Sequence, residues 1–146
     1  MLTQQIFFNT FYALIGSLGF SIIFNIRGKH LIFASLGGGI SWFCYEIGLA
    51  LEQSSVVSMF MATCMVTVYS EILARRMKIP ATIVIISSVI PLVPGGGMYY
   101  TMLESVNGNE VGFLKKLTIT LFEAGAIAIG IVLVSSFARI LKMQKR

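Results

Sequence analysis

The sequence predicts an all-α integral membrane protein, a bundle of five transmembrane helices in which the fourth helix is broken at residues 91–97. Apolar residues make up 56% of the 146 residues and charged residues only 12%, which is half of the roughly 25% that is usual in soluble domains. Five stretches are apolar and long enough to span a bilayer, for which a helix needs about 20 residues. A cluster of proline and glycine interrupts the fourth stretch. We expect one transmembrane domain over residues 1–146.

The five predicted spans are separated by short polar or charged segments. They cover about residues 4–26, 31–51, 56–74, 79–103 and 117–138. Residues 27–30 and 52–55 form the first two connections, and the basic residues 75–78 form the third. A longer connection over residues 104–116 contains Asn107-Gly108-Asn109, a run that is typical of turns.

The distribution of lysine and arginine predicts the orientation. With five spans, one side of the membrane carries nine basic residues and the other carries two. The nine are Arg27, Lys29, Arg75, Arg76, Lys78, Arg139, Lys142, Lys145 and Arg146, and the two are Lys115 and Lys116. Since basic loops stay in the cytoplasm, the N-terminus is expected outside and the C-terminus inside. A re-entrant fourth segment would give seven against four, a weaker bias.

The proline and glycine cluster is the strongest candidate for a functional site. Proline removes a backbone donor and clashes with the preceding turn, and glycine adds backbone freedom. Broken backbone inside a membrane is tolerated only where protein or a water-filled cavity receives the freed groups. Transporters use such breaks to present amides to substrate carboxylates, whereas the simpler alternative is a kink that shapes helix packing. The predicted substrate-binding residues are Pro91, Pro94, Gly95, Gly96, Gly97 and Tyr99.

The run Pro-Leu-Val-Pro-Gly-Gly at residues 91–96 resembles the signature of the bacterial threonine/serine exporter family. The chain is similar to the small, all-membrane subunit of its two-component members, which corresponds to the C-terminal half of the single-chain exporters. The resemblance implies a proton-driven exporter of small amino acids or small carboxylic acids in the bacterial cytoplasmic membrane. It also implies a partner, the larger subunit of the family, which has its own membrane bundle. A channel or a purely structural subunit remains the alternative.

Three glutamates fall inside predicted spans, where a charge is costly. Glu46 and Glu123 are expected roughly 8–10 Å below the outer surface at 1.5 Å per helical residue, where they could share one cavity. A low dielectric favours the protonated carboxyl group, so we predict that Glu123, with Glu46 as second candidate, takes up a coupling proton. The alternative for both is a hydrogen bond to a neighbouring helix or a contact with the partner. Glu71 stands four residues before Arg75, and a local salt bridge is expected there.

Other classes of function lack the residues that they need. The chain has one histidine, His30, and no aspartate, so the usual metalloprotease and paired-aspartate sites are missing. We expect no enzymatic activity, no cofactor and no metal site. The basic residues form no continuous face with interleaved aromatic residues, so no nucleic-acid partner is expected. Small residues at Gly37–Gly39 and at Ala126 and Gly130 favour close helix packing, which is also compatible with a homo-oligomer in the lipid bilayer.

Overall fold

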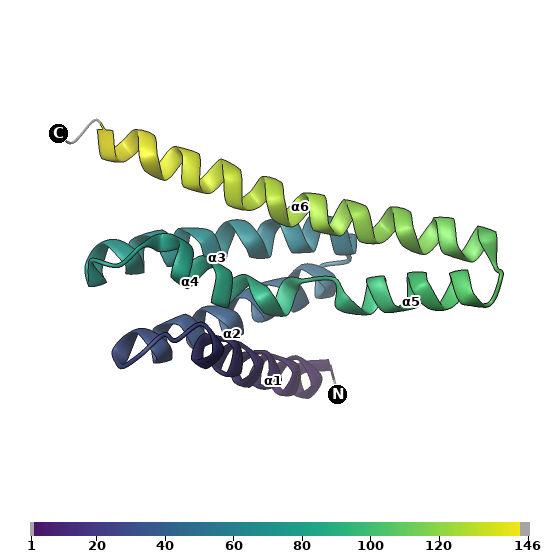
Figure 1. The fold of residues 1–146 in the computed structure, drawn as a ribbon, viewed down its shortest axis with the longest axis horizontal. Helices are drawn as coiled ribbons and strands as arrows, with labels where there is room; N and C mark the ends of the chain where they lie inside the picture. The colour runs from purple at the N-terminus through teal and green to yellow at the C-terminus, as the bar shows by residue number, and fades with distance from the viewer. Residues whose placement is uncertain (1, 144–146) are drawn as a thin grey trace.

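The computed structural model describes residues 2–143, with the side chains of residues 4–141. This part of the chain forms helices and no strands, as the sequence predicts (Figure 1). The helices are α1 (Leu2–Ile23), α2 (Lys29–Ala50), α3 (Ser55–Met77), α4 (Ala81–Val89), the short 3-10 helix η1 (Ile90–Leu92), α5 (Gly95–Val106) and α6 (Glu110–Met143). Lys145 and Arg146, which belong to the predicted basic tail, lie outside the described residues.

The fourth predicted span consists of two helices. α4 and α5 are joined through η1 and bent by 49° relative to each other. The α3–α4 and α5–α6 connections nevertheless lie at opposite ends of the molecule (Figure 1), whereas a re-entrant loop would return both to one end. Within the described residues, α1, α2, α3, α6 and the bent pair give up to five candidate spans. The predicted bundle with a broken fourth helix is therefore confirmed.

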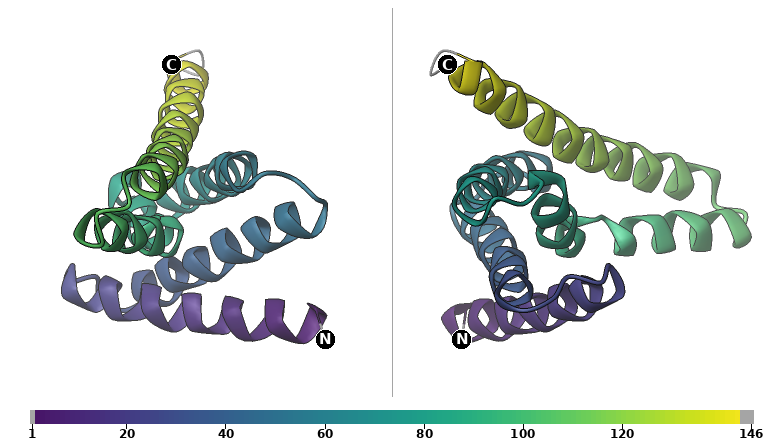
Figure 2. Two further views of the ribbon diagram at one scale, coloured as in Figure 1. Left: turned by 90° about the vertical axis from the view of Figure 1, so that its right-hand side faces the viewer. Right: turned by 60° about the vertical axis from the view of Figure 1, so that its left-hand side comes forward.

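The connection between α5 and α6 is shorter than the sequence predicts. α5 continues to Val106 and α6 begins at Glu110, because the charged residues around the turn are good helix formers although they are not apolar. The turn itself uses Gly108 at φ 69°. The side chain of Asn109 then caps α6 by accepting a hydrogen bond from the Gly112 N–H at 3.0 Å. α5 and α6 therefore form a long hairpin that extends beyond the other helices (Figures 1 and 2).

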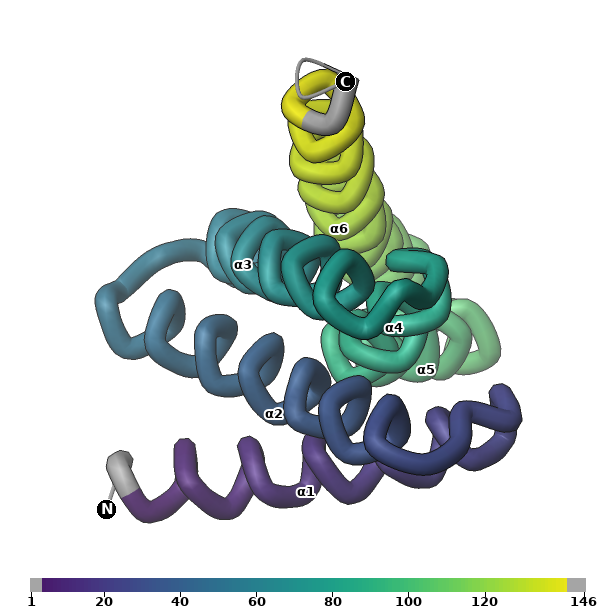
Figure 3. Tube along the Cα trace, turned by 90° about the vertical axis from the view of Figure 1, so that its left-hand side faces the viewer, coloured from purple at the N-terminus to yellow at the C-terminus, as the bar shows by residue number. Residues whose placement is uncertain are grey.

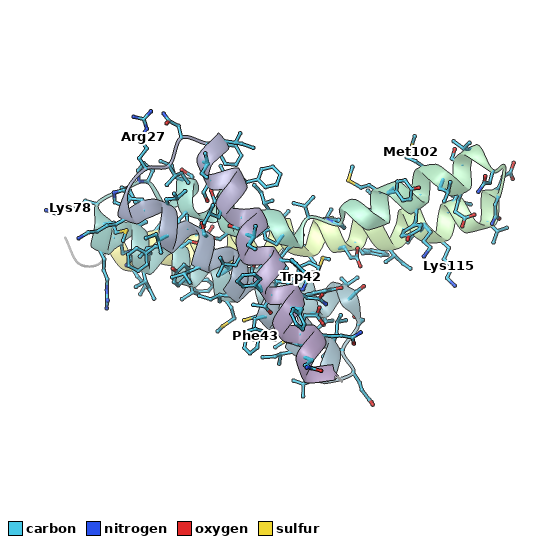
Figure 4. All side chains as sticks on the ribbon, turned by 90° about the horizontal axis from the view of Figure 1, so that it is seen from below. Arg27, Trp42, Phe43, Lys78, Met102 and Lys115 are labelled. Carbon is cyan, nitrogen blue, oxygen red and sulfur yellow. The ribbon has the colours of Figure 1, made fainter. Side chains whose placement is uncertain are left out.

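The helices are arranged in layers when the molecule is viewed along its long axis. α1 lies on α2, α2 lies on α3 and α4, and α6 covers α3 on the far side (Figure 3). α5 packs on α6. Arg27 and Lys78 lie at one end of the bundle, and Lys115 lies on the projecting hairpin toward the other end (Figure 4). The C-terminal end of α6 lies at the same end as the α3–α4 connection (Figure 1).

The surface of the bundle is apolar. Large apolar side chains such as Phe7, Phe122 and Phe137 are more than half exposed, which is the surface that a lipid bilayer would cover. In the interior, small hydroxyl side chains lie beside buried apolar residues. The hydroxyl residues exposed by 2% or less are Ser17, Ser21, Ser35, Ser41, Ser58, Thr63, Thr67, Ser70, Ser87 and Ser88.

Glycines allow these hydroxyl residues to approach neighbouring helices. A Cβ atom added at Gly37 would overlap the side chain of Ser88, and one at Gly38 would overlap Ser17. A Cβ atom at Gly130 would crowd Thr63 in the same way. The prediction that these small residues permit close helix packing is therefore confirmed.

Candidate functional site

The break between α4 and α5 is supported by a hydroxyl group from another helix. Pro91 has no N–H, so the carbonyl of Ser87, four residues earlier, loses its helical donor. The buried hydroxyl of Ser17 on α1 replaces that donor and hydrogen-bonds the Ser87 oxygen at 2.7 Å. Beyond Pro91, the Val93 N–H donates to the Ile90 oxygen at 3.1 Å. The carbonyl that Pro91 leaves without a helical donor is thus satisfied inside protein, as broken helices in membranes require.

α5 begins directly after the break with unpaired amides. Its first capping bond runs from the Met98 N–H to the Pro94 oxygen at 3.0 Å, and the Gly95 N–H donates to Val93 oxygen at 2.7 Å. Among the described residues, no backbone oxygen accepts a hydrogen bond from Gly96 or Gly97 N–H. Two N–H groups are therefore free at the positive end of a helix dipole.

These amides border a cavity of about 380 Å³, which we call the glycine cavity. One wall is the break itself, from Pro91 to Gly97, together with Tyr100. The other walls are residues of α2, α3 and α6. They are Trp42, Tyr45, Met59, Lys116, Ile119, Thr120 and Glu123. The space beside Gly95 and Gly96 is open, since a Cβ atom added at either would meet nothing within 4 Å.

The glycine cavity contains one basic and one acidic side chain, both from α6. Lys116 and Glu123 are seven residues apart, which places them on one helix face at a spacing of about 10 Å. The ammonium of Lys116 lies 5.6 Å from the centre of the Tyr100 ring, in cation–π contact. Glu123 is 8% exposed, and within the described residues no donor hydrogen-bonds its carboxylate.

Glu46 lies outside the lining of the glycine cavity and contacts it through Trp42. One carboxylate oxygen of Glu46 accepts hydrogen bonds from the Asn9 amide at 2.9 Å and from the Trp42 indole at 3.0 Å. Trp42 in turn lines the glycine cavity and a neighbouring, mostly apolar cavity of about 430 Å³ beside α1. Of the two carboxylates, only Glu123 lines the glycine cavity.

The structure brings together most of the predicted site. Pro91, Pro94, the three glycines and Glu123 border one cavity, whereas Tyr99 is 63% exposed and does not line it. Tyr100 takes that place instead. Sequence reasoning missed Lys116 and Thr120, which precede Glu123 by seven and three residues on one helix face. That spacing is visible in the sequence, but residue 116 falls in the segment that hydropathy predicts to be a connection.

The predicted salt bridge at the basic end of α3 is confirmed. A guanidinium nitrogen of Arg75 lies 4.0 Å from the carboxylate of Glu71. The same nitrogen donates a hydrogen bond to the Ala138 carbonyl of α6 at 2.7 Å. Glu71 is thus accounted for by local structure.

Comparison with known proteins gives three findings. The sequence model of one family, described as "Threonine/Serine exporter, ThrE", matches residues 9–137. A curated protein of Haemophilus influenzae, described as "Uncharacterized protein", is 23% identical over 137 residues, which cover 88% of this chain and 46% of the relative. The chain therefore spans about half the length of that relative. No solved structure matches.

Proposed function

The chain belongs to the threonine/serine exporter family, and we propose that it is the membrane subunit of a two-component, proton-coupled exporter of small amino acids or small carboxylic acids. Membership of this family supports a transport function in a membrane. The observation that carries the finer proposal is the glycine cavity, which combines free helix amides with a buried carboxylate.

The glycine cavity has the polar groups that a small amino acid needs. The free amides of Gly96 and Gly97 are donors for the substrate carboxylate, and Lys116 supplies a positive charge on the same side. Glu123 supplies the negative charge that an ammonium group requires. One cation and one carboxylate complement a zwitterion, whereas a dicarboxylate leaves Glu123 as a repulsive neighbour. A small amino acid is therefore favoured over a dicarboxylate, and the family description points to threonine and serine among the amino acids.

Glu123 also offers a simple means of proton coupling. A carboxylate of this kind holds either a substrate ammonium group or a proton, because protonation removes the charge that attracts the ammonium. A proton that enters from the outer side neutralises Glu123 and releases the substrate outward. Loss of that proton to the cytoplasm restores the carboxylate for the next substrate. Competition for one group thus exchanges an inward proton for an outward substrate.

The proposed arrangement places the protein in the bacterial cytoplasmic membrane, with the N-terminus outside and the C-terminus in the cytoplasm. The support is that Arg27 and Lys78 gather at one end of the bundle (Figure 4). The larger family subunit would supply the part of the relative that this chain does not match. Several copies of each chain would then form the complete exporter.

The direct test is the export of labelled L-threonine, L-serine and succinate from cells that make this chain with and without the larger family subunit. We expect saturable, proton-dependent export of the two amino acids only when both chains are present. Full transport by the purified chain alone would contradict the two-component proposal. Export of succinate in preference to the amino acids would overturn the assignment of Glu123 to an ammonium group.

Replacement of one carboxylate tests the coupling. Glu123→Gln keeps the size of the side chain but cannot titrate, so we expect export to become slower and its pH dependence to flatten. The matched control is Glu110→Gln, which removes a carboxylate from the exposed start of the same helix. An unchanged pH profile in Glu123→Gln would defeat the coupling role. Normal export in this variant and in glycine cavity variants would instead indicate a structural subunit.

A further inference from the structure

A third cavity, of about 600 Å³, lies at the basic end of the bundle between α3, α4 and α6. We call it the basic-end cavity. Its charged lining residues are Glu71, Arg75, Lys78 and Arg139. Its uncharged lining residues are Ala74, Ile79, Pro80, Ala81, Thr82, Ile85, Ser135 and Ala138. The glycine cavity and the basic-end cavity share no lining residue.

The basic-end cavity has an excess of positive charge. Three cations face one carboxylate, and Arg75 is occupied by Glu71 and by the Ala138 carbonyl. In the described part of the chain, no carboxylate forms an ion pair with Lys78 or Arg139. Both side chains are exposed. The cavity therefore presents two available cations to an incoming anion.

The two cavities lie on one seam of the bundle. On α6, the glycine cavity is lined by Lys116, Thr120 and Glu123, and the basic-end cavity by Ser135 and Ala138. Helical steps of three or four residues connect the two sets through Ile127, Gly130 or Ile131, and Val134. The same holds on α4 and η1, where steps of three or four residues lead from Ala81 through Ile85 and Val89 of α4 to Leu92 of η1.

An apolar cluster separates the cavities along this seam. Its buried members are Met59, Ala62, Val66, Ile85, Val89, Leu92 and Ile127. Met59 and Leu92 also line the glycine cavity, and Ile85 lines the basic-end cavity. The cluster thus touches both cavities, and its other four buried members, Ala62, Val66, Val89 and Ile127, line neither.

We propose that the basic-end cavity is a vestibule of the transport path. Lys78 and Arg139 bind the substrate carboxylate there before the apolar cluster opens toward the glycine cavity. This inference rests on the proposed exporter function and adds a binding site to it. A vestibule at the basic end faces the cytoplasm in the proposed orientation, which is where an exporter takes up its substrate. Glu71 is the one carboxylate in the lining, and its negative charge attracts the ammonium group of an amino acid.

The first test measures export as a function of substrate concentration on the basic side. Lys78→Gln combined with Arg139→Gln is expected to raise the half-saturating L-threonine concentration about two- to fivefold, as suits two exposed charges, with the maximal rate retained. The matched control is Arg76→Gln, which removes a charge from the same end but does not line the cavity. An unchanged half-saturating concentration would defeat the vestibule alone, whereas no export from the unmodified complex would defeat the exporter proposal.

The second test detects binding without transport. Thr82→Cys, in a chain with Cys44→Ala and Cys64→Ala, places one thiol in the basic-end cavity. L-Threonine is expected to slow maleimide labelling of this thiol, and sodium chloride at the same concentration is not. The protection should be lost when Lys78→Gln and Arg139→Gln are added. Equal protection with and without the two cations would overturn the assignment.

The third test distinguishes the substrate from a lipid headgroup, which has the same anionic chemistry. The first measurement is repeated in vesicles of phosphatidylcholine alone and of phosphatidylcholine with phosphatidylglycerol. The difference between the unmodified and doubly substituted chains should persist without phosphatidylglycerol. If it appears only with phosphatidylglycerol, the cavity holds a phospholipid headgroup and the proposal is wrong.

The fourth test examines the apolar cluster. A thiol at Val89→Cys is expected to be unreactive at rest and to become reactive during turnover with L-threonine. Ala34→Cys is the matched control, since Ala34 is fully buried but lines neither cavity and is no member of the apolar cluster. Reactivity of both thiols would indicate general loosening, and reactivity of neither during turnover would place the path elsewhere.

Discussion

Two runs of three glycines have opposite surroundings in this bundle. Gly37–Gly39 lies inside the continuous helix α2, and a Cβ atom at Gly37 or Gly38 would overlap a serine of a neighbouring helix. Gly95–Gly97 opens α5, and a Cβ atom at Gly95 or Gly96 would meet nothing within 4 Å. The first run fits helices together, whereas the second borders a cavity and is open at Gly95 and Gly96, with only Gly97 packed closely on Thr120.

The difference arises from what precedes each run. No proline stands near Gly37, so the helix continues and the glycines serve only to reduce its width. Pro91 and Pro94 precede Gly95 and remove two helical donors, so the glycines there expose backbone amides. A run of three glycines therefore allows close helix packing in α2 and exposes backbone amides at the start of α5. The prolines that precede the second run cause the difference.

The largest expected effect comes from filling the packed run. Gly38→Val would force a branched side chain against Ser17 and the α1 backbone. Overpacking of this kind costs about 3 kcal/mol at its upper end, so we expect a clearly lower melting temperature. Thermal unfolding in detergent, followed by circular dichroism, measures the loss. A Gly38→Val variant as stable as the unmodified chain would remove the distinction between the two runs.

The second effect concerns the open run, where bulk should harm function and spare the fold. Gly96→Val adds side-chain volume beside the amides of the glycine cavity. We expect export to fall about tenfold or more, equivalent to about 1.4 kcal/mol in transition-state binding, with an unchanged melting temperature. Gly19→Val is a useful control, since it also meets open space but lies on α1 and lines none of the three cavities. Equal export by both variants would contradict a role for the open run.

The fold was largely predictable because apolar length determines membrane spans. The helix ends around residues 104–116 were not, because Glu104, Glu110, Lys115 and Lys116 are polar residues that nevertheless extend helices. Hydropathy measures membrane affinity and does not measure helix propensity. Because these polar residues continue both helices, α5 and α6 form the projecting hairpin.

The candidate site was predictable only where a local signal exists. A broken helix can be predicted from neighbouring residues alone, namely Pro91, Pro94 and the glycines that follow them. Trp42 and Tyr45 reach the same cavity only because α2 crosses the break, and that crossing depends on packing between distant segments. The buried hydroxyl of Ser17 belongs to the same class, since its partner Ser87 is 70 residues away.

The third prediction concerns the contact between the packed glycine run of α2 and the break before α5. Ser17 packs on Gly38 and also donates to the Ser87 carbonyl that Pro91 leaves free. Ser17→Ala should cost about 1 kcal/mol of stability, because a buried carbonyl loses its donor. The cost should shrink in a Pro91→Ala background, where residue 91 regains an N–H for Ser87. Ser21→Ala is the control, since that hydroxyl bonds only within α1. Equal costs of Ser17→Ala in both backgrounds would show that the hydroxyl does not replace the missing donor.

The smallest expected effect is spectroscopic and follows the connection along α2. Gly38, Trp42 and Glu46 are spaced by four residues on one helix face, so this face leads from the packed run to the glycine cavity. Trp42 is the chain's single tryptophan, and its indole N–H donates to Glu46.

Fluorescence therefore reports on this one ring. Glu46→Gln retains an oxygen that accepts from Trp42 and Asn9, so the emission maximum should stay close to that of the unmodified chain. Glu46→Ala leaves the indole without its acceptor, so the ring can move between the two cavities that it lines. The emission maximum should then shift by a few nanometres, and iodide should quench the fluorescence more readily. L-Threonine in the glycine cavity should alter the emission of the unmodified chain and of Glu46→Gln. Identical spectra for Glu46→Gln and Glu46→Ala would show that the carboxylate does not hold the ring, and the packed and open regions would then be joined through Ser17 alone.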